Sequence, residues 1–303
     1  MRPATPAPVP QQSDQSGQPD QPEQPAAADD RGRPELLPSE TVDRLSVTLA
    51  RAPGTIGCAV RLDDGRAFAF DANRVHASAS TIKVPILVSA LLACQEGRLS
   101  LDEPVALPPG SERVGGSGPI LLLPSLEALP LREILTLMIA LSDNDATNAV
   151  IGLLGFPAVA EVLAQVPTRH TRLERTMMNP AAVARGEDNE TSAADLVAIV
   201  VALRDGRLLD RVHTETALAI LRTQQFLEGL PAYLPESVTV ASKTGSIPGM
   251  RGDVALFERD GRWAVVAVLA SDLGEGEAAV AVDRGTAVLP AFADVGEAVA
   301  ALL

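Results

Sequence analysis

Residues 80–97 read STIKVPILVSALLACQEG, an apolar run with a single lysine near its beginning. The run is long enough for a buried helix, and Gly97 is the residue type that commonly ends one. Ser80 and Lys83 fall in its first turn, three residues apart. This spacing places both side chains on one face of the predicted helix, within hydrogen-bonding reach of each other.

The segments on either side of this helix predict a sheet assembled from both ends of the chain. Apolar runs at 55–62 and 67–70 are separated by DDG, a hairpin signal. Three further strands are predicted at 238–242, 252–257 and 263–270, the last two joined by ERDG. The remaining ordered segments predict helices, and the middle third of the chain contains no strand signal. The predicted helices are 39–52 with Ser39 as N-cap, 131–141, 145–154, 157–165, 193–203, 214–222 and about 284–302.

Composition divides the chain into a tail and one domain. Residues 1–35 are rich in Pro, Gln and Asp and cannot bury enough apolar surface to offset their ordering entropy, so we predict a disordered tail there. The domain is predicted over 36–303. Within it, we expect 36–75 and about 225–303 to form a sheet lobe and about 76–224 a helical lobe, with a site in the cleft between them.

Charge and hydropathy limit the partners. The formal net charge of −14 argues against nucleic acid or an anionic membrane surface, and it favours a monomer because copies of the protein repel one another. No run approaches the ~18 apolar residues of a membrane span. The N-terminal sequence has no apolar signal-peptide core, so we expect a cytoplasmic location; a leader upstream of an alternative start would instead make the protein secreted.

Nothing in the sequence indicates a metal or a cofactor. Cys58 and Cys94 lack metal-ligand spacing and are interpreted as small buried apolar residues, although a disulfide between them stays open. The glycine-rich loop at 115–119 lacks the lysine and hydroxyl residue that would follow in a phosphate-binding loop. We therefore expect a small-molecule substrate and no cofactor.

The use of basic residues is unusual. Of the 25 basic residues, only Lys83 and Lys243 are lysines, and the other 23 are arginines. Arginine stays protonated at any working pH, whereas burial can turn a lysine amine into a base. The two lysines therefore indicate places where a guanidinium cannot serve.

Both lysines belong to short motifs that suit nucleophilic catalysis. A serine hydroxyl is a poor nucleophile until a base removes its proton, and Lys83 is placed to assist Ser80. The N-terminus of the helix also favours a developing oxyanion. Lys243 begins KTG at the end of a predicted strand, and SDN occupies 142–144 after a predicted helix. The Ser-x-x-Lys pair alone is a weak signal, but the three motifs together rarely coincide.

This motif set resembles that of class A β-lactamases and penicillin-binding proteins. The resemblance extends to Asn148, to TRLER at 171–175 and to Arg251-Gly252, and it covers nearly everything after the tail. It implies a mixed α/β (α+β) fold with two lobes. In that fold, a five-stranded antiparallel sheet flanked by helices lies beside an all-helical lobe.

The resemblance also implies catalytic roles. Ser80 would attack a carbonyl and form an acyl-enzyme, with Lys83 accepting or relaying the serine proton. Ser142 would pass a proton toward the leaving group, and Lys243 would tune it electrostatically. The backbone N–H groups of Ser80 and Ser246 would form the oxyanion hole.

Substrate binding is implied for a second group of residues. Asn144 would bind an amide carbonyl of the substrate. Thr244, Gly245 and Arg251, together with Lys243, would hold a substrate carboxylate, a task suited to clustered cations and a hydroxyl.

One loop departs from the family pattern. Family members carry a glutamate that activates the deacylating water, but here RLERTMMN at 172–179 is two residues shorter and has no glutamate at that position. Asn179 matches the asparagine of the family's deacylation loop, and Asn148 is assigned to the same region. Glu187 and Glu190 lie in a polar stretch and are interpreted as solvated charges.

We therefore expect a serine hydrolase that cleaves a β-lactam or a related amide or ester through an acyl-Ser80 intermediate. Two alternatives stay open. One is a carboxylesterase or acyltransferase on the same fold, and the other is a β-lactam-binding protein that is acylated without efficient deacylation. An inert relic of the fold is disfavoured by the two retained lysines.

Overall fold

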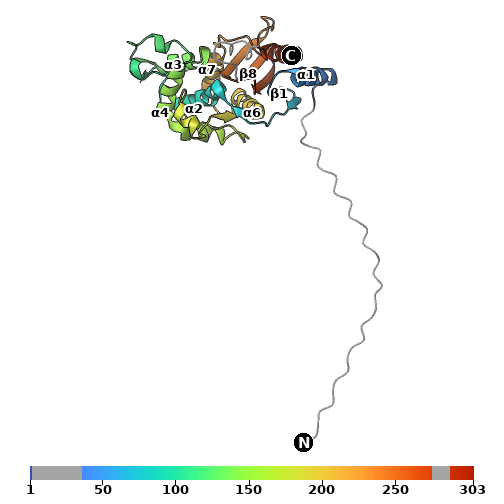
Figure 1. Cartoon of the computed structure of the whole chain (residues 1–303), viewed down its shortest axis with the longest axis horizontal. Coiled ribbons are helices and arrows are strands. Elements are labelled where there is room, and N and C mark those ends of the chain that lie inside the picture. The colour runs from blue at the N-terminus through green and yellow to red at the C-terminus, as the bar shows by residue number, and fades with distance from the viewer. Residues whose placement is uncertain (2–35, 275–286) are drawn as a thin grey trace, which may run out of the picture. The chain divides into compact units, whose positions relative to one another are not determined.

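The computed structural model describes residues 36–274 and 287–303, together with Met1 (Figure 1). The predicted tail at 1–35 lies outside the described residues apart from Met1, and so does the beginning of the predicted last helix at 284–286. The described residues from 36 onward belong to one compact unit.

A five-stranded antiparallel sheet forms the centre of this unit, as the sequence predicts (Figure 1). Its order is β2-β1-β9-β8-β7, so the first and last thirds of the chain meet where β1 pairs with β9. Its strands are β1 (Thr55–Leu62), β2 (Ala67–Phe70), β7 (Thr239–Ile247), β8 (Met250–Arg259) and β9 (Arg262–Ser271).

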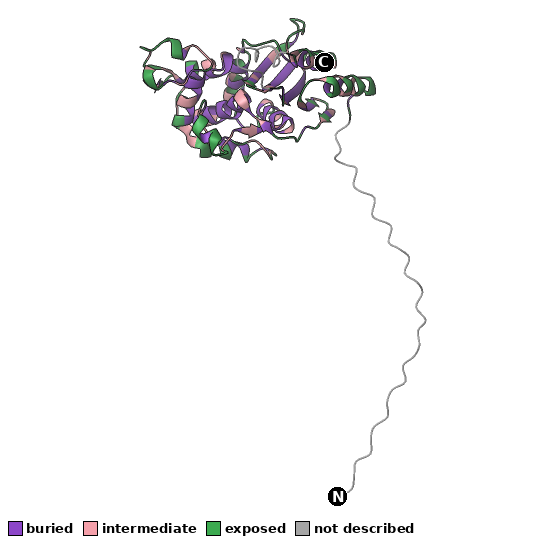
Figure 2. Cartoon of the chain, viewed as in Figure 1, coloured by how far each residue is buried: buried purple, intermediate pink, exposed green. Residues whose placement is uncertain are grey.

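Helices cover both faces of the sheet, which explains why β9 is almost continuously apolar. Val266 and Val268 pack in the same cluster as α1 (Ser39–Arg51) and α9 (Leu289–Ala300). Val265 and Leu269 point the other way, into a cluster that includes α6 (Ala193–Arg204). Figure 2 shows the result as a buried sheet with exposed residues at the periphery of the unit.

Several other helices pack around the apolar segment at 80–97. It forms α2, which is buried along nearly its whole length and contacts α3, α4 and α7. The bounds of these four helices are α2 (Lys83–Gln95), α3 (Leu131–Ala140), α4 (Asn144–Leu163) and α7 (Arg211–Leu221). A short further helix is α5 (Pro180–Ala184).

Two predicted helix starts are wrong by a few residues. Ser80 lies in a separate 3₁₀ turn, η1 (Ala79–Ile82), ahead of α2. Pro85 has no N–H to donate to a carbonyl four residues earlier, so the first turn cannot be a regular α-turn. Ser39 is the first residue of α1 rather than its cap, because Pro38 takes the cap position without a side-chain bond.

The strand predictions also need correction. The expectation that the middle third lacks strands is wrong, because short two-stranded ladders occur there that are too brief to produce a periodic pattern. They pair β3 (His76–Ala77) with β6 (Glu190–Thr191), and β4 (Pro104–Ala106) with β5 (Ala128–Pro130). The strand predicted to end at Ser242 continues to Ile247 because β8 pairs with it throughout.

Helix α4 is long and apolar enough to cross a membrane by length and composition alone. It is interrupted at Gly155, where φ is +71°, which fits the two helices predicted from the sequence. Its first turns carry Asp145 and Asn148, whose side chains bond to neighbouring loops, and its apolar side packs on α2 and α3. These are the contacts of a core helix.

Two helical glycines give a matched test of the packing. A methyl group at Gly296 of α9 would lie 1.9 Å from the Leu230 carbonyl oxygen, so we expect Gly296→Ala to destabilise the protein by about 1–3 kcal/mol. Gly152 of α4 faces open space, so Gly152→Ala should stabilise by about 0.5–1 kcal/mol. Urea unfolding of both variants measures the difference. Equal effects would contradict the close approach of α9 to Leu230.

Candidate active site

A cavity of about 730 Å³ contains most of the residues that the sequence nominates. η1, the SDN segment, the 175–183 segment, β7 and the first turn of α9 all contribute to its wall. Lys83 and Lys243 are fully buried and do not line it. The nominated residues in its lining are Ser80, Ser142, Asn144, Asn179, Thr244, Gly245, Ser246 and Arg251.

Close packing of β7 on η1 brings the KTG motif to Ser80. A Cβ atom on Gly245 would lie 3.2 Å from the Ser78 carbonyl oxygen and 3.1 Å from Thr81 Cγ2. The strand therefore passes directly over the turn that carries Ser80. A side chain at residue 245 would hold the two elements apart, so glycine is required here for its small size.

The Lys83 amine sits between α2 and the SDN segment. Its Nζ lies 2.6 Å from the carbonyl oxygen and 3.1 Å from Oγ of Ser142, and 2.9 Å from Oδ1 of Asn144. Since Lys83 is fully buried, these three oxygens are the groups that replace water around its amine. The second motif is thus attached directly to the first.

The SDN segment combines a strained backbone conformation at Ser142 with a helix cap at Asp143. Ser142 has φ +53°, a conformation that costs a non-glycine residue about 1–3 kcal/mol. Asp143 compensates by capping α4, with its carboxylate accepting from the backbone N–H groups of Ala146 at 2.8 Å and Ile120 at 2.9 Å. Asp143 is therefore structural, and its neighbours Ser142 and Asn144 face the cavity.

Both lysines have depressed pKa values. Burial lowers the pKa of Lys83 well below its usual 10.5, and the like charge of Lys243 lowers it further, against an opposing effect of Asp143. Burial lowers the pKa of Lys243 to about 7, with Asp253 opposing the shift. The two residues singled out by the composition are thus amines that can be neutral at physiological pH.

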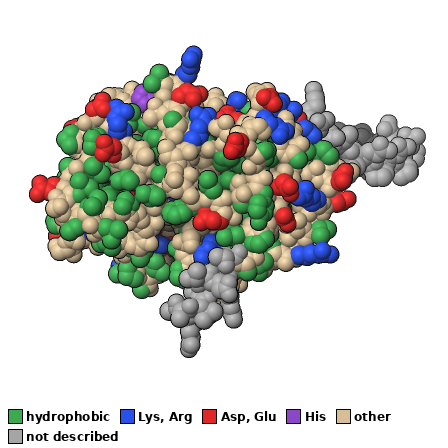
Figure 3. Space-filling model, turned by 90° about the horizontal axis from the view of Figure 1, so that it is seen from above, with side chains coloured by type: hydrophobic (Ala, Val, Ile, Leu, Met, Phe, Trp, Pro, Cys, Tyr) green, Lys and Arg blue, Asp and Glu red, His purple; other side chains and the backbone are tan. Residues whose placement is uncertain are grey.

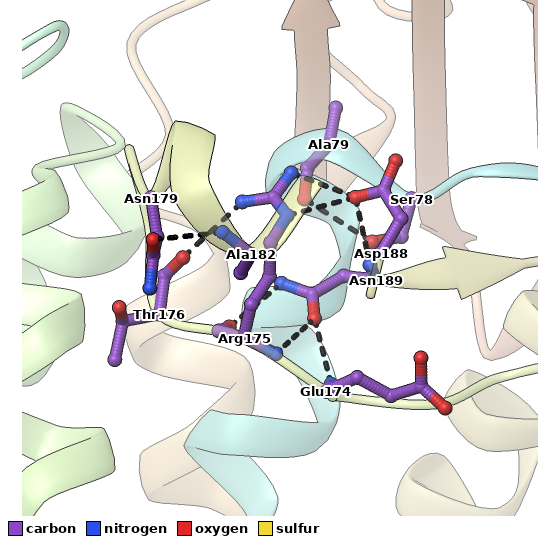
Figure 4. A network of polar contacts seen from close by, with 9 residues as sticks. All are labelled: Ser78, Ala79, Glu174, Arg175, Thr176, Asn179, Ala182, Asp188 and Asn189. Atoms are coloured by element: carbon purple, nitrogen blue, oxygen red, sulfur yellow. Dashed lines mark hydrogen bonds and ion pairs between the residues drawn. The ribbon is translucent and has the colours of Figure 1, made fainter. Parts of the chain in front are cut away.

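The loop opposite β7 is held by a polar network (Figure 4). Asn189 accepts from the backbone N–H groups of Glu174 and Arg175 at 2.8 and 3.0 Å, and its own amide donates to the Arg175 carbonyl. The Arg175 guanidinium pairs with Asp188 at 2.8 Å. These bonds join the two ends of the loop, and Ser78 donates its N–H to the Asn189 carbonyl, which ties the loop to η1.

Asn148 fixes the middle of this loop. Its Oδ1 accepts from the Met177 N–H at 2.7 Å, and its Nδ2 donates to the Met177 carbonyl at 3.2 Å. Met177 therefore lines the cavity in a defined position, whereas Asn148 itself does not reach it. Asn179 lines the cavity but uses its Oδ1 to cap α5. The backbone at Met177 is thus clamped to α4, and an apolar side chain is presented there.

The two glutamates considered in the sequence lie away from the site. Glu187 pairs with Arg185 on the surface, and Glu190 pairs with Arg172 at 2.6 Å. Neither lines the cavity. Among the described residues, the acids that do line it are Glu228 and Asp253.

Sequence reasoning missed several residues of the cavity. Asp253 was detectable, because it lies two residues beyond Arg251 on the same strand and alternate strand residues share a face. Met177 and the aromatic side chains had no motif to mark them. The missed lining residues include Met177, Met178, Phe226, Glu228, Asp253, Leu289 and Phe292.

The comparison with known proteins identifies the family. Residues 39–296 match the model of the β-lactamase enzyme family. The chain belongs to this family.

Several relatives show how far the likeness extends. A β-lactamase from Rhodobacter capsulatus is 28% identical over 172 residues, which cover 52% of this chain and 55% of that protein. The chain thus spans about half the length of this curated relative. A solved β-lactamase from Sphaerobacter thermophilus is 28% identical, with a TM-score of 0.77 over 86% of this chain and 97% of that one. The structure of PBP-A is 25% identical, with a TM-score of 0.76 over 89% and 98%.

An ancestral class A β-lactamase is also 25% identical, with a TM-score of 0.75 over 87% of this chain and all of that one. These matches confirm the resemblance drawn from the three motifs and the fold that it implied.

Proposed function

We propose that this family member is a serine hydrolase in which a β-lactam, or a related amide or ester, acylates Ser80 and leaves slowly. The observation that carries the proposal is the buried Lys83 amine, held against Ser142 one helical turn from Ser80. On the face of the molecule shown in Figure 3, acidic and basic side chains lie scattered among apolar ones. Most of the catalytic and binding residues nominated by the sequence instead line the cavity.

The acylation step uses the neutral form of Lys83. A neutral amine can donate to the Ser142 carbonyl and to Asn144 Oδ1, which leaves its lone pair for a hydroxyl proton. As Ser80 Oγ attacks the substrate carbonyl, its proton passes to this amine, and Ser142 Oγ at 3.1 Å relays a proton to the departing nitrogen or oxygen. Backbone N–H groups of Ser80 and Ser246 stabilise the oxyanion.

The substrate lies along β7, which is an edge strand of the sheet. An edge strand leaves backbone groups free on one side, which suits an amide substrate bound as an extra strand. Asn144 receives an amide carbonyl of the substrate. At the other end, Thr244 and Arg251 receive a carboxylate, assisted by Lys243 when it is protonated.

Deacylation lacks an evident base. Met177, clamped by Asn148, lines the acyl side of the cavity, and neither Glu187 nor Glu190 reaches it. Water beside the acyl group is therefore not activated by a carboxylate of the loop, so we expect a long-lived acyl-enzyme. A variant of PBP-A in which a glutamate replaces a leucine was solved as an acyl-enzyme complex with penicillin G, so a protein with this fold can hold such an adduct.

Removing the nucleophile is the first test. Ser80→Ala should abolish covalent labelling by benzylpenicillin and by a fluorophosphonate, measured as the mass shift of the intact protein. Ser111→Ala, at an exposed serine outside the cavity, is the control and should label like the wild type. Labelling that persists in Ser80→Ala would contradict the assignment.

Replacing Lys83 tests the need for a neutral amine. Lys83→Arg should slow acylation by about 10²-fold or more, nearly as much as Lys83→Ala, because a guanidinium does not give up its proton. In the wild type, acylation should fall as the pH drops through the lowered pKa of Lys83, since protonation removes the base. Labelling reactions that are quenched at set times and analysed by mass spectrometry measure the rates of the variants and the pH dependence of the wild type. Wild-type rates in Lys83→Arg, with folding verified by thermal unfolding, would overturn this role.

Installing an acid on the loop tests the account of slow turnover. Met177→Glu places a carboxylate at the clamped position, so the adduct with benzylpenicillin should decay about tenfold faster or more, as general-base assistance allows. Met177→Gln is the matched control, because it has the same shape and no base. The decay of the adduct mass over time reports the result. Equal decay in both variants would show that the missing acid does not limit deacylation.

A further inference from the structure

Asp253 is a buried acid placed among the residues that face the substrate. In the ladder between β7 and β8, Thr244 pairs with Asp253 and Ser246 pairs with Arg251. Paired residues share a face of the sheet, and so do alternate residues of one strand. Asp253 thus belongs to the same row as the two residues proposed to hold a carboxylate, and it lines the cavity.

Its carboxylate is incompletely satisfied. Asp253 is 1% exposed, and its Oδ2 accepts from the Leu230 N–H at 3.0 Å. Its Oδ1 is buried and has no hydrogen-bond partner among the described residues. Gly229 leaves room for this group, because a Cβ there would lie 2.6 Å from Oδ2. An ionised carboxylate so poorly partnered is destabilised by burial, which favours its protonated form.

The charges around Asp253 have opposite effects on its ionisation. Lys243 on β7 stabilises the Asp253 anion, Glu228 on the preceding loop disfavours it, and Arg251 lies two residues away on β8. β9 presents the uncharged Val268 opposite Asp253, and α9 contributes Leu289 and Phe292 to the cavity. Lys243 and Asp253 are both fully buried, Asp253 in the cavity wall and Lys243 on the neighbouring residue of β7, and each favours the ionised form of the other.

We propose that Asp253 is a specificity-determining residue, whose protonation state sets how strongly the cavity holds a substrate carboxylate. The inference rests on the proposed function of the site. Protonated, Asp253 is neutral and does not repel an anion; ionised, it repels one from its buried position beside the cavity. It therefore acts in opposition to Arg251 and Lys243, and it makes the preference for anionic substrates depend on pH.

The direction of the dependence follows from the buried pair. Burial raises the pKa of Asp253 to about 7 and lowers that of Lys243 to about 7. As the pH rises through this region, Lys243 loses its positive charge and Asp253 gains a negative one. The attraction for a carboxylate is therefore present below pH 7 and lost above it. In Asp253→Asn residue 253 cannot ionise, so only the loss of the Lys243 charge weakens the attraction for a carboxylate as the pH rises.

The small number of lysines allows a test that needs no substrate. Nuclear magnetic resonance of protein labelled with ¹³C at the lysine Cε follows just two sites, Lys83 and Lys243. Because Asp253 is the charge that supports protonated Lys243, Asp253→Asn should move the Lys243 titration to lower pH. Glu228→Gln removes an exposed acid from the same cavity and is the matched control, with a smaller shift expected. An unchanged Lys243 titration in Asp253→Asn would overturn the proposal.

The effect on specificity is measured with benzylpenicillin and its methyl ester, which differ only in the carboxylate. In the wild type, the ratio of their acylation rates should fall about tenfold or more between pH 7 and 9, since each coupled proton contributes up to tenfold per pH unit. Asp253→Asn should show a smaller fall, because only the loss of the Lys243 charge remains, and Glu228→Gln should follow the wild type. Identical pH profiles of the ratio in wild type and Asp253→Asn would refute the role of Asp253.

The two experiments separate the inference from the function on which it rests. If neither probe acylates Ser80 at any pH, the proposed function fails, and the lysine titration still decides whether Asp253 and Lys243 are coupled. If acylation is normal but the selectivity of Asp253→Asn is unchanged, only the inference fails.

Discussion

Placing the Lys83 amine in a fully buried position is the constraint on which the rest of the site depends. A buried amine must find hydrogen-bond partners or lose its charge, and here it does both: its pKa is depressed, and three oxygens of the SDN segment surround it. This requirement holds the segment against α2, with Ser142 at positive φ and Asp143 capping α4. The buried amine thus fixes Ser142 and Asn144, while Asp143 between them caps α4.

The cavity divides into two ends with different electrostatics. At one end, Asn148 clamps a loop that presents Met177, and among the described residues no carboxylate of that loop lines the cavity. On the β7 side, Arg251 lies among the acids Asp253 and Glu228, and Lys243 is buried nearby without lining the cavity. The proposed slow deacylation and the proposed dependence of substrate selection on charge both rest on this difference between the two ends.

Much of the fold and the site was predictable because local sequence carried the information. The apolar 80–96 segment, the hairpin signals and the three motifs depend on spacing along a helix or strand, and they predicted the sheet and the residues of the cavity wall. Met177 was missed for a physical reason, whereas the position of Asp253 on its strand was predictable and only its burial was not. Met177 is placed by an asparagine 29 residues away, and Asp253 is buried by a loop and a neighbouring strand that meet it only in the folded state.

The sequence by itself determined the chemistry available: a serine with a lysine three residues later, a second lysine in a strand segment, and no acid at the expected place in the loop. The tertiary structure alone decided what those groups can do. Proton affinity depends on burial and on charges from elements distant in the chain, so the depressed pKa values of both lysines and the raised pKa of Asp253 exist only once α2, β7 and β8 are packed together.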